Sequence, residues 1–310
     1  MATSAPRSAR DSPWAKESTW ALRADAAEAA VIHRHVRRLW LLPWTRMGRV
    51  RWPADFRSAT YLSWQYWWQA HLIDCAVDAA ARSPTAARRR RLARLARASR
   101  IRNLTGWGND YHDDMAWMAL ALERASRKCG GRHERGIETL TSALRSGIDA
   151  ETGVLPWRRG GDFYNTPANG PAAMLFARLG DTDSATRIAD WIDGTLRDER
   201  TGLVCDGVRA GEFELRYFSY CQGVVLGAEF ELALRTRESR HTERIRRLVA
   251  AIAEGVCVDG VIVGDGGGDG GLFAGILARH LATIACELPD TSPGDAGARV
   301  EAARVVITSA

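Results

Sequence analysis

Two adjacent carboxylates, Asp113 and Asp114, are the residues whose types and spacing most directly suggest chemistry. They follow a loop rich in Gly and Asn, and from Met115 onward apolar residues recur at the three- and four-residue steps of a helix. Mutual repulsion raises the pKa of one member of such a pair, which separates an acid from a nucleophile. Retaining cleavage of a glycosidic bond uses carboxyl groups about 5 to 5.5 Å apart, and neighbours at a helix start can reach that separation.

Helix capping is the structural alternative for this pair. Asp is favoured at N-caps and in first turns, where it accepts amide hydrogen bonds and meets the positive end of the helix dipole. Capping does not require the aromatic and donor side chains that surround the pair, which are Trp107, Tyr111, His112 and Trp117. Flat aromatic faces beside carboxylates suit a sugar ligand.

The segment Tyr111-His112-Asp113-Asp114-Met115-Ala116-Trp117 resembles the aromatic, Asp-Asp, Trp signature of glycoside hydrolase family 76, the endo-α-1,6-mannanase family. Three later segments match the family in the same order, and they begin at Asn165, Gly202 and Tyr220. The resemblance covers about residues 60 to 285. Four ordered segments are a more specific signal than one Asp-Asp pair.

The resemblance implies an all-α fold, an (α/α)6 barrel of stacked helical hairpins. It also implies retaining hydrolysis of α-1,6-mannosidic linkages in mannan-type glycans, with Asp113 as nucleophile and Asp114 as acid/base. The chain departs from the family pattern at Met118, where a second Trp is frequent, and at Cys221, where an Asn is frequent. These departures concern the subsites more than the chemistry.

Further residues are predicted to contact substrate. Aromatic candidates for sugar platforms are Trp68, Trp107, Tyr111, Trp117 and Trp157, and polar candidates are His112, Asn165, Asn169, Asp206, Tyr220, Gln222 and Asp269. Core packing is the alternative for the aromatic residues, and capping is the alternative for Asp269. Two other functions stay open: a glycan-binding relative without activity, and a helical-barrel sugar epimerase or lyase, which would rest on His and Tyr.

Helical periodicity predicts about eleven helices over residues 18–310, read as a single domain behind a flexible leader, residues 1–17. The helices predicted with both bounds are Ser18–Trp40, Ala86–Arg102, Arg132–Gly147, Ala168–Leu179, Ser184–Arg197, Ser219–Arg235, Glu238–Gly255, Gly271–Cys286 and Gly297–Ile307. One more helix is predicted to begin near Phe56, and another between His112 and Asp114. Short and long connections alternate, which is typical of stacked helical hairpins. A long loop, Asp149–Pro167, is expected to be functional.

Composition and charge limit the remaining classes. The net charge of +6 comes almost wholly from Arg, and Arg88–Arg102 predicts a helix whose basic face is either solvated or in weak contact with an anionic surface. Six scattered Cys and seven His without ligand spacing predict no metal or cofactor, and the Cys are expected to be small buried residues of a reducing compartment. No secretory signal, membrane span or nucleic-acid motif is recognisable, so a cytoplasmic monomer acting on an oligosaccharide or polysaccharide is expected.

Overall fold

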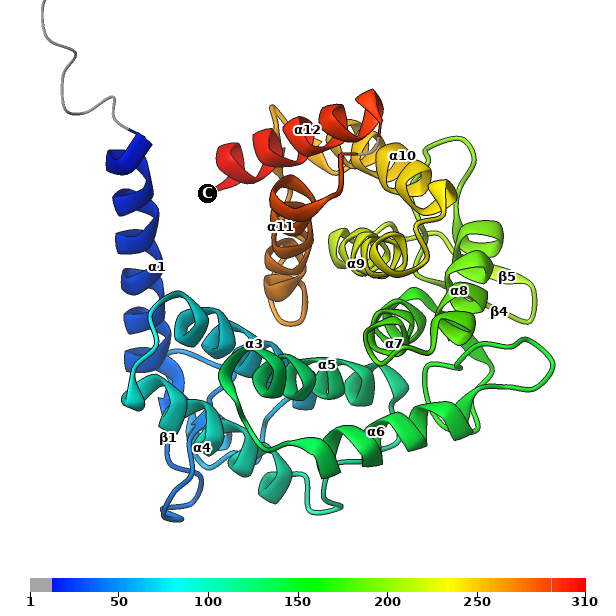
Figure 1. Ribbon diagram of the computed structural model, residues 1–310. Coiled ribbons are helices and arrows are strands. Elements are labelled where there is room, and N and C mark those ends of the chain that lie inside the picture. The colour runs from blue at the N-terminus through cyan, green and yellow to red at the C-terminus, as the bar shows by residue number, and fades with distance from the viewer. Residues whose placement is uncertain (1–12, 291) are drawn as a thin grey trace, which may run out of the picture. The chain divides into compact units, whose positions relative to one another are not determined.

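The computed structural model describes residues 13–290 and 292–310 (Figure 1). Twelve α-helices carry most of this part of the chain, and the strands are only two or three residues long. The chain divides into two compact units. Unit 1 holds the residues up to Gly106 together with Arg124–His133, and unit 2 holds Trp107–Glu123 and Glu134–Ala310. The predicted single domain over residues 18–310 therefore stays a prediction.

Unit 1 contains α1 (Pro13–His35), α2 (Phe56–Ala59), α3 (Tyr66–Arg82) and α4 (Ala86–Arg102), with an antiparallel pair formed by β1 (Val36–Arg37) and β2 (Met47–Gly48). The bounds of α4 are those predicted. The first helix begins at Pro13 rather than Ser18 and ends at His35 rather than Trp40. Residues 1–12 of the predicted leader lie outside the described residues.

The helix expected from Phe56 is interrupted, which the sequence pattern did not indicate. Asp55 caps α2 by accepting the backbone N–H of Ser58 at 2.8 Å. Tyr61 then adopts a left-handed backbone conformation with φ of 58°, and α3 begins only at Tyr66. The chain therefore makes two helices, α2 and α3, where one was predicted.

Ion pairs within unit 1 change the interpretation of the basic helix. Arg88 on α4 pairs with Asp25 at 2.8 Å and with Glu28 at 2.5 Å, and both acidic residues lie on α1. Arg91 pairs with the same Glu28 at 2.6 Å. Part of the predicted basic face of α4 is thus neutralised by α1.

Unit 2 contains the first part of α5 (His112–Cys129), followed by α6 (Glu134–Gly147), α7 (Thr166–Arg178), α8 (Thr182–Trp191), α9 (Ser219–Thr236), α10 (Ser239–Gly255), α11 (Gly270–Glu287) and α12 (Pro293–Ser309). A π-helix, Ile192–Leu196, continues α8. Figure 1 shows α9 between α7 and α11, and α8 and α10 also pack on α9. Successive helices therefore pair as hairpins, as the alternation of loop lengths predicted.

Short strands join the loops of unit 2. The antiparallel sheet β3–β4–β5 consists of Phe163–Asn165, Gly207–Arg209 and Glu212–Glu214, with Asn165 opposite Gly207. A hairpin of β6 (Cys257–Val258) and β7 (Val261–Ile262) follows α10. The predicted loop Asp149–Pro167 thus contains β3 and the first turn of α7.

Glycines permit the close approach of the central helices of unit 2. A Cβ on Gly170 of α7 would lie 2.5 Å from Val224 of α9. A Cβ on Gly223 of α9 would lie 3.0 Å from the Cα of Leu277 on α11. Because backbone cannot move aside as a flexible side chain can, Gly223 sets the distance between α9 and α11.

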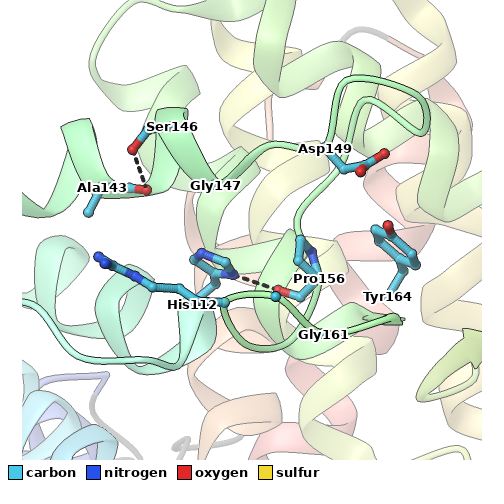
Figure 2. A pocket seen from close by; sticks show the side chains of 10 residues that line it. His112, Ala143, Ser146, Gly147, Asp149, Pro156, Gly161 and Tyr164 are labelled. Carbon is cyan, nitrogen blue, oxygen red and sulfur yellow. Dashed lines mark hydrogen bonds between the residues drawn. The ribbon is translucent and has the colours of Figure 1, made fainter.

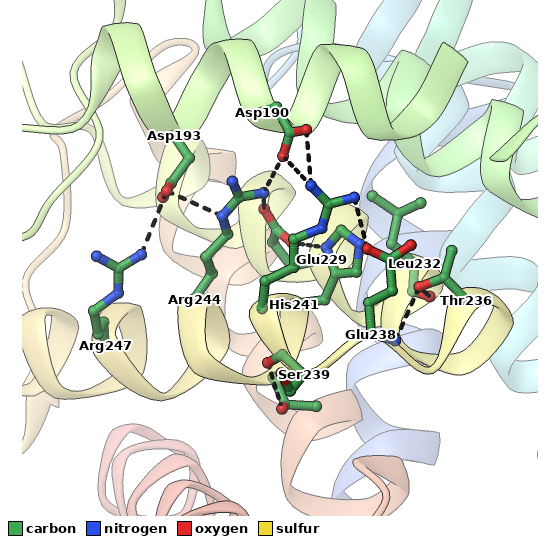
Figure 3. A network of polar contacts seen from close by, with 12 residues as sticks. Asp190, Asp193, Glu229, Leu232, Thr236, Glu238, Ser239, His241, Arg244 and Arg247 are labelled. Atoms are coloured by element: carbon green, nitrogen blue, oxygen red, sulfur yellow. Dashed lines mark hydrogen bonds and ion pairs between the residues drawn. The ribbon is translucent and has the colours of Figure 1, made fainter. Parts of the chain in front are cut away.

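An ion network links α8, the π-helix, α9 and α10 (Figure 3). Glu229 on α9 is almost fully buried and accepts from His241 Nδ1 at 2.6 Å and from Arg244 at 3.3 Å. Arg244 also pairs with Asp190 at 2.7 Å and Asp193 at 3.0 Å. A buried carboxylate needs such partners, because an unpaired charge in the interior is costly.

We expect Gly223→Ala to lower the free energy of unfolding by about 1 to 3 kcal/mol, because its methyl group overpacks the backbone of α11. Gly275→Ala is the matched control. A Cβ at that exposed position on α11 meets nothing within 4 Å, so alanine should stabilise by about 0.5 to 1 kcal/mol. Urea unfolding of both variants measures the difference, and equal effects would contradict the packing argument.

Candidate active site

Asp113 lies in the first turn of α5 and is held by two hydrogen bonds of different origin. Its Oδ1 accepts the backbone N–H of Asp114 at 2.8 Å, and its Oδ2 accepts the indole N–H of Trp157 at 2.9 Å. The second donor comes from the loop before β3, so this carboxylate does more than cap its own helix. The side chain remains half-buried and keeps access to solvent.

Asp114 is oriented by the loop that precedes α5. The amide of Asn109 donates from Nδ2 to Asp114 Oδ2 at 2.7 Å, and its Oδ1 accepts the backbone N–H of Tyr111 at 2.9 Å. One amide side chain therefore positions both the carboxylate and the turn that leads to it. Asn109 was expected only as a loop former, because its hydrogen bond to Asp114 depends on the turn that the fold creates.

Backbone hydrogen bonds align the two loops that supply these donors. His112 N–H donates to Trp157 O at 2.9 Å, and Arg159 N–H donates to Asp110 O at 2.8 Å. This pairing brings the rings of Tyr111 and Trp157 to a centroid distance of 5.1 Å, at an angle of 57°. Trp157 is 37% exposed, so the pair presents an aromatic surface beside Asp113.

Asp206 and Tyr220 share the electrostatic environment of Asp113. Burial raises the pKa of Asp113 to about 6, the charge of Asp206 acts in the same direction, and the hydrogen bond from Trp157 opposes them. Burial likewise raises the pKa of Asp206 to about 6. Burial raises the pKa of Tyr220 well above its usual value, and the Cys221 thiol and both carboxylates raise it further. Acidic groups with raised pKa values thus gather at one place in unit 2.

Backbone and side-chain contacts fix this group. The backbone of Asp206 donates to Arg216 O at 2.9 Å and accepts from Thr166 N–H at 2.8 Å. The Cys221 thiol, fully buried, donates to Asp206 Oδ1 at 3.7 Å. The Tyr220 ring stacks on Phe273 of α11 at a centroid distance of 3.9 Å. The sequence analysis missed Phe273, because nothing in a local pattern connects the starts of α9 and α11.

His112 is held by the loop that follows α6. Its Nδ1 bonds to the carbonyl oxygen of Pro156 at 2.7 Å, and burial lowers the pKa of the ring. The ring packs against Gly147 and lines a pocket of about 320 Å³ (Figure 2). The residues that line this pocket are His112, Ala143, Ser146, Gly147, Asp149, Pro156, Arg159, Gly160, Gly161 and Tyr164. His112 is therefore a loop-holding residue here rather than part of the Asp113 group.

Three amide side chains that were predicted to bind sugar hydroxyls make hydrogen bonds to the protein backbone. Asn169 accepts from Leu155 N–H at 2.9 Å and donates back to Leu155 O at 2.8 Å. Gln222 makes the same two-way contact with Val204, at 2.9 and 2.8 Å. Asn165 caps α7. All three are buried, and these contacts position the loops around the site, so direct binding of sugar hydroxyls by these residues stays a prediction.

The remaining aromatic candidates lie in packed surroundings. A Cβ on Gly136 of α6 would lie 3.0 Å from the Trp107 ring, so that ring packs on α6. Trp117 on α5 is buried. Trp68 belongs to unit 1, where its ring meets Trp67 edge-on at 6.2 Å. These positions agree with the core-packing alternative for Trp107 and Trp117.

The glycine-rich loop before α11 presents one further candidate. Asp269 is exposed at the N-cap position of α11, and its side chain makes no capping hydrogen bond. The capping alternative for Asp269 is therefore wrong. Asp265 of the same loop accepts from the hydroxyl of Ser219, which ties the loop to the start of α9.

The findings on metal sites and membrane-spanning helices apply to the described residues only. Among them no group of three or more His, Cys, Asp or Glu is placed to hold a metal ion, and no helix is long and apolar enough to cross a bilayer. None of the six cysteines forms a disulfide. Cys205 and Cys221 are buried as predicted, whereas Cys75 and Cys286 are exposed because they lie on outward faces of α3 and α11.

The helical hairpins define the class of protein as an all-α protein of the (α/α)6 type. The chain belongs to glycosyl hydrolase family 76, whose family model matches residues 25–304. The predicted family and fold class are thereby confirmed. A comparison with curated proteins found no match.

Solved structures resemble the chain over most of its length. The α-1,6-mannanase GH76A from Salegentibacter sp. HEL1_6 is 26% identical, with 79% of this chain and 77% of that chain covered and a TM-score of 0.74. An inactive variant of that enzyme in complex with α-1,6-mannotetrose is 23% identical, with 93% of this chain and 86% of that chain covered and a TM-score of 0.81. Lin0763 from Listeria innocua covers the same shares at 23% identity, with a TM-score of 0.78.

We expect Asp206→Asn to stabilise the protein at pH 8 by about 1 to 3 kcal/mol, because it removes a buried carboxylate whose raised pKa favours the protonated form. A raised folded-state pKa contributes stability that is present below the unfolded value and lost as pH rises through about 6. The gain should therefore vanish near pH 4. Urea unfolding at both pH values tests this, and an equal gain at pH 4 and pH 8 would contradict the argument.

We expect Trp157→Phe to raise the pKa of Asp113 further, since the ring is kept and the indole N–H that stabilises the carboxylate is lost. Carbon-13 NMR of Asp side-chain carboxyls follows this titration directly. Phe163→Leu is the control, because Phe163 meets the edge of the Trp157 ring without donating to Asp113. An unchanged titration in Trp157→Phe would mean that the indole bond does not control the carboxylate.

Proposed function

We propose that this glycoside hydrolase cleaves α-1,6-mannosidic linkages in mannan-type glycans with retention, using Asp113 as nucleophile and Asp114 as acid/base. One observation carries the proposal: two adjacent, half-buried carboxylates each receive a hydrogen bond from a side chain of a different loop. In the related α-1,6-mannanase, a variant with two adjacent aspartates changed to asparagine is inactive, and its structure is a complex with α-1,6-mannotriose. We infer that those positions correspond to Asp113 and Asp114.

In the first step the Asp113 carboxylate attacks the anomeric carbon while Asp114 protonates the departing glycosidic oxygen. Asp114 then removes a proton from water, which displaces the sugar from Asp113. The indole N–H of Trp157 supports the ionised form that the first step requires. Because the pKa of Asp113 is about 6, this ionised form prevails above that pH.

The surroundings supply contacts for a pyranose ring. The half-buried Tyr111 and the exposed Trp157 offer aromatic faces for the apolar side of a sugar, and Asp206 and Tyr220 offer hydrogen bonds to hydroxyl groups. From the sequence alone, Trp68, Trp107, Trp117 and Asp269 remain proposed sugar contacts. An epimerase or lyase is less well supported, because His112, the histidine beside the carboxylates, is turned onto the Pro156 carbonyl.

We expect Asp113→Ala to lower kcat on linear α-1,6-mannooligosaccharides by at least about a thousandfold. Asp114→Ala should lose about a hundredfold to ten-thousandfold, and less on an aryl mannoside whose leaving group needs no protonation. NMR of the first product formed by wild type should give the α-anomer. Asp110→Ala, which removes an exposed carboxylate from the same loop, should leave turnover near wild type.

Added azide assigns the two roles. With Asp114→Ala it should attack the glycosyl-enzyme and give an α-mannosyl azide, whereas with Asp113→Ala it should attack the substrate itself and give the β-azide. The reverse pattern would exchange the two roles. Wild type that binds the oligosaccharide without cleaving it would instead support the glycan-binding alternative.

A further inference from the structure

The connection between α1 and α3 presents an unusual set of apolar side chains to solvent. Leu41 is 84% exposed and Trp44 is 68% exposed. Together with three more exposed neighbours they form what we call the Trp40 patch, which consists of Trp40, Leu41, Leu42, Trp44 and Leu62. Single exposed apolar residues are ordinary, but a gathered set of this kind marks an interaction surface. The patch lies within unit 1.

The patch is built on a packed base. Leu39, Met47 and Tyr61, from the same connection, are fully buried against Ala98 of α4. Thr45 accepts the backbone N–H of Leu39 at 3.2 Å and donates to Leu42 O at 2.7 Å. The connection therefore has buried side chains that hold it against α4 and exposed apolar side chains that form the patch.

Three residues of the Trp40 patch have strained backbone conformations. Trp40, Leu41 and Trp44 have φ values of 44°, 65° and 60°, in the left-handed region that favours glycine or asparagine. Bulky residues there cost about 1 kcal/mol or more each. This strain accompanies the exposure of two tryptophans and a leucine, and the Trp40 indole N–H donates to Thr60 O at 2.8 Å.

Tryptophan contacts join the patch to positive charge. Residues 36–62 include six arginines and one acidic residue, Asp55. From α4, the Arg94 guanidinium lies 5.4 Å from the centre of the Trp44 ring, and that of Arg102 lies 5.6 Å from the Trp40 ring. Arg94 and Arg102 thus bring positive charge next to the two tryptophan rings of the patch.

We propose that the Trp40 patch docks on an anionic lipid bilayer. Leucine side chains enter the acyl boundary, tryptophan rings suit the headgroup level, and surrounding arginines attract acidic headgroups. A sugar platform would use the ring faces but has no use for exposed leucines. The charge comes from the connection and from Arg94 and Arg102 of α4, whereas α1 neutralises Arg88 and Arg91.

The test uses the full chain and vesicles of phosphatidylcholine alone or mixed equally with phosphatidylglycerol. Cosedimentation should detect binding to the mixed vesicles, weaker binding at high salt, and little binding to phosphatidylcholine. The variant Leu41→Asn/Trp44→Asn should bind at least about tenfold more weakly. Asparagine tolerates the left-handed backbone, so its thermal unfolding temperature should be equal to or above that of wild type.

The control Val300→Gln/Ile307→Gln removes two exposed apolar residues from α12 and should bind vesicles as wild type does. Wild type that ignores anionic vesicles would overturn the proposal, as would equal vesicle binding by Leu41→Asn/Trp44→Asn. If that variant loses affinity for α-1,6-mannooligosaccharide and keeps its vesicle binding, the patch is a sugar platform instead.

Discussion

The hydrogen bond from the Trp157 indole to Asp113 is the contact on which the candidate site depends. Burial favours the protonated carboxyl, and this donor, with the backbone N–H of Asp114, favours the ionised one. The bond requires a loop of more than a dozen residues to return to the start of α5 at a defined register. The exchange of backbone hydrogen bonds at His112 and Arg159 provides that register.

The packing of unit 2 extends the same constraint. Gly170 and Gly223 let α7, α9 and α11 approach closely, so the helix starts that carry the site have little freedom to move apart. Asn169 and Gln222 use their amides to hold the preceding loops against those helices. Rigid helices bound to loops by buried amides are a suitable support for groups that must meet a sugar within fractions of an ångström.

Periodicity predicted most of the helices because each one buries a continuous face, and α4 has the predicted bounds. The adjacent carboxylates were likewise visible as a local pattern. Asn109 and Phe273 were missed as site residues, since their roles depend on contacts that only the fold creates. Asn169 and Gln222 were assigned to substrate for the same reason. Their partners lie 14 and 18 residues away in sequence, where no local pattern identifies them.

Two neighbouring carboxyls with pKa values of about 6 cannot titrate independently. Loss of the first proton makes loss of the second harder. Over part of the pH range, one of the two carboxyls is therefore protonated and the other is ionised. In the proposed mechanism, a sugar hydroxyl that donates to Asp206 would stabilise its charge, whereas the ionised Asp113 would stay free to attack. That mechanism would couple substrate binding to ionisation through Asp206, and an apolar residue in its place would increase stability and remove the coupling.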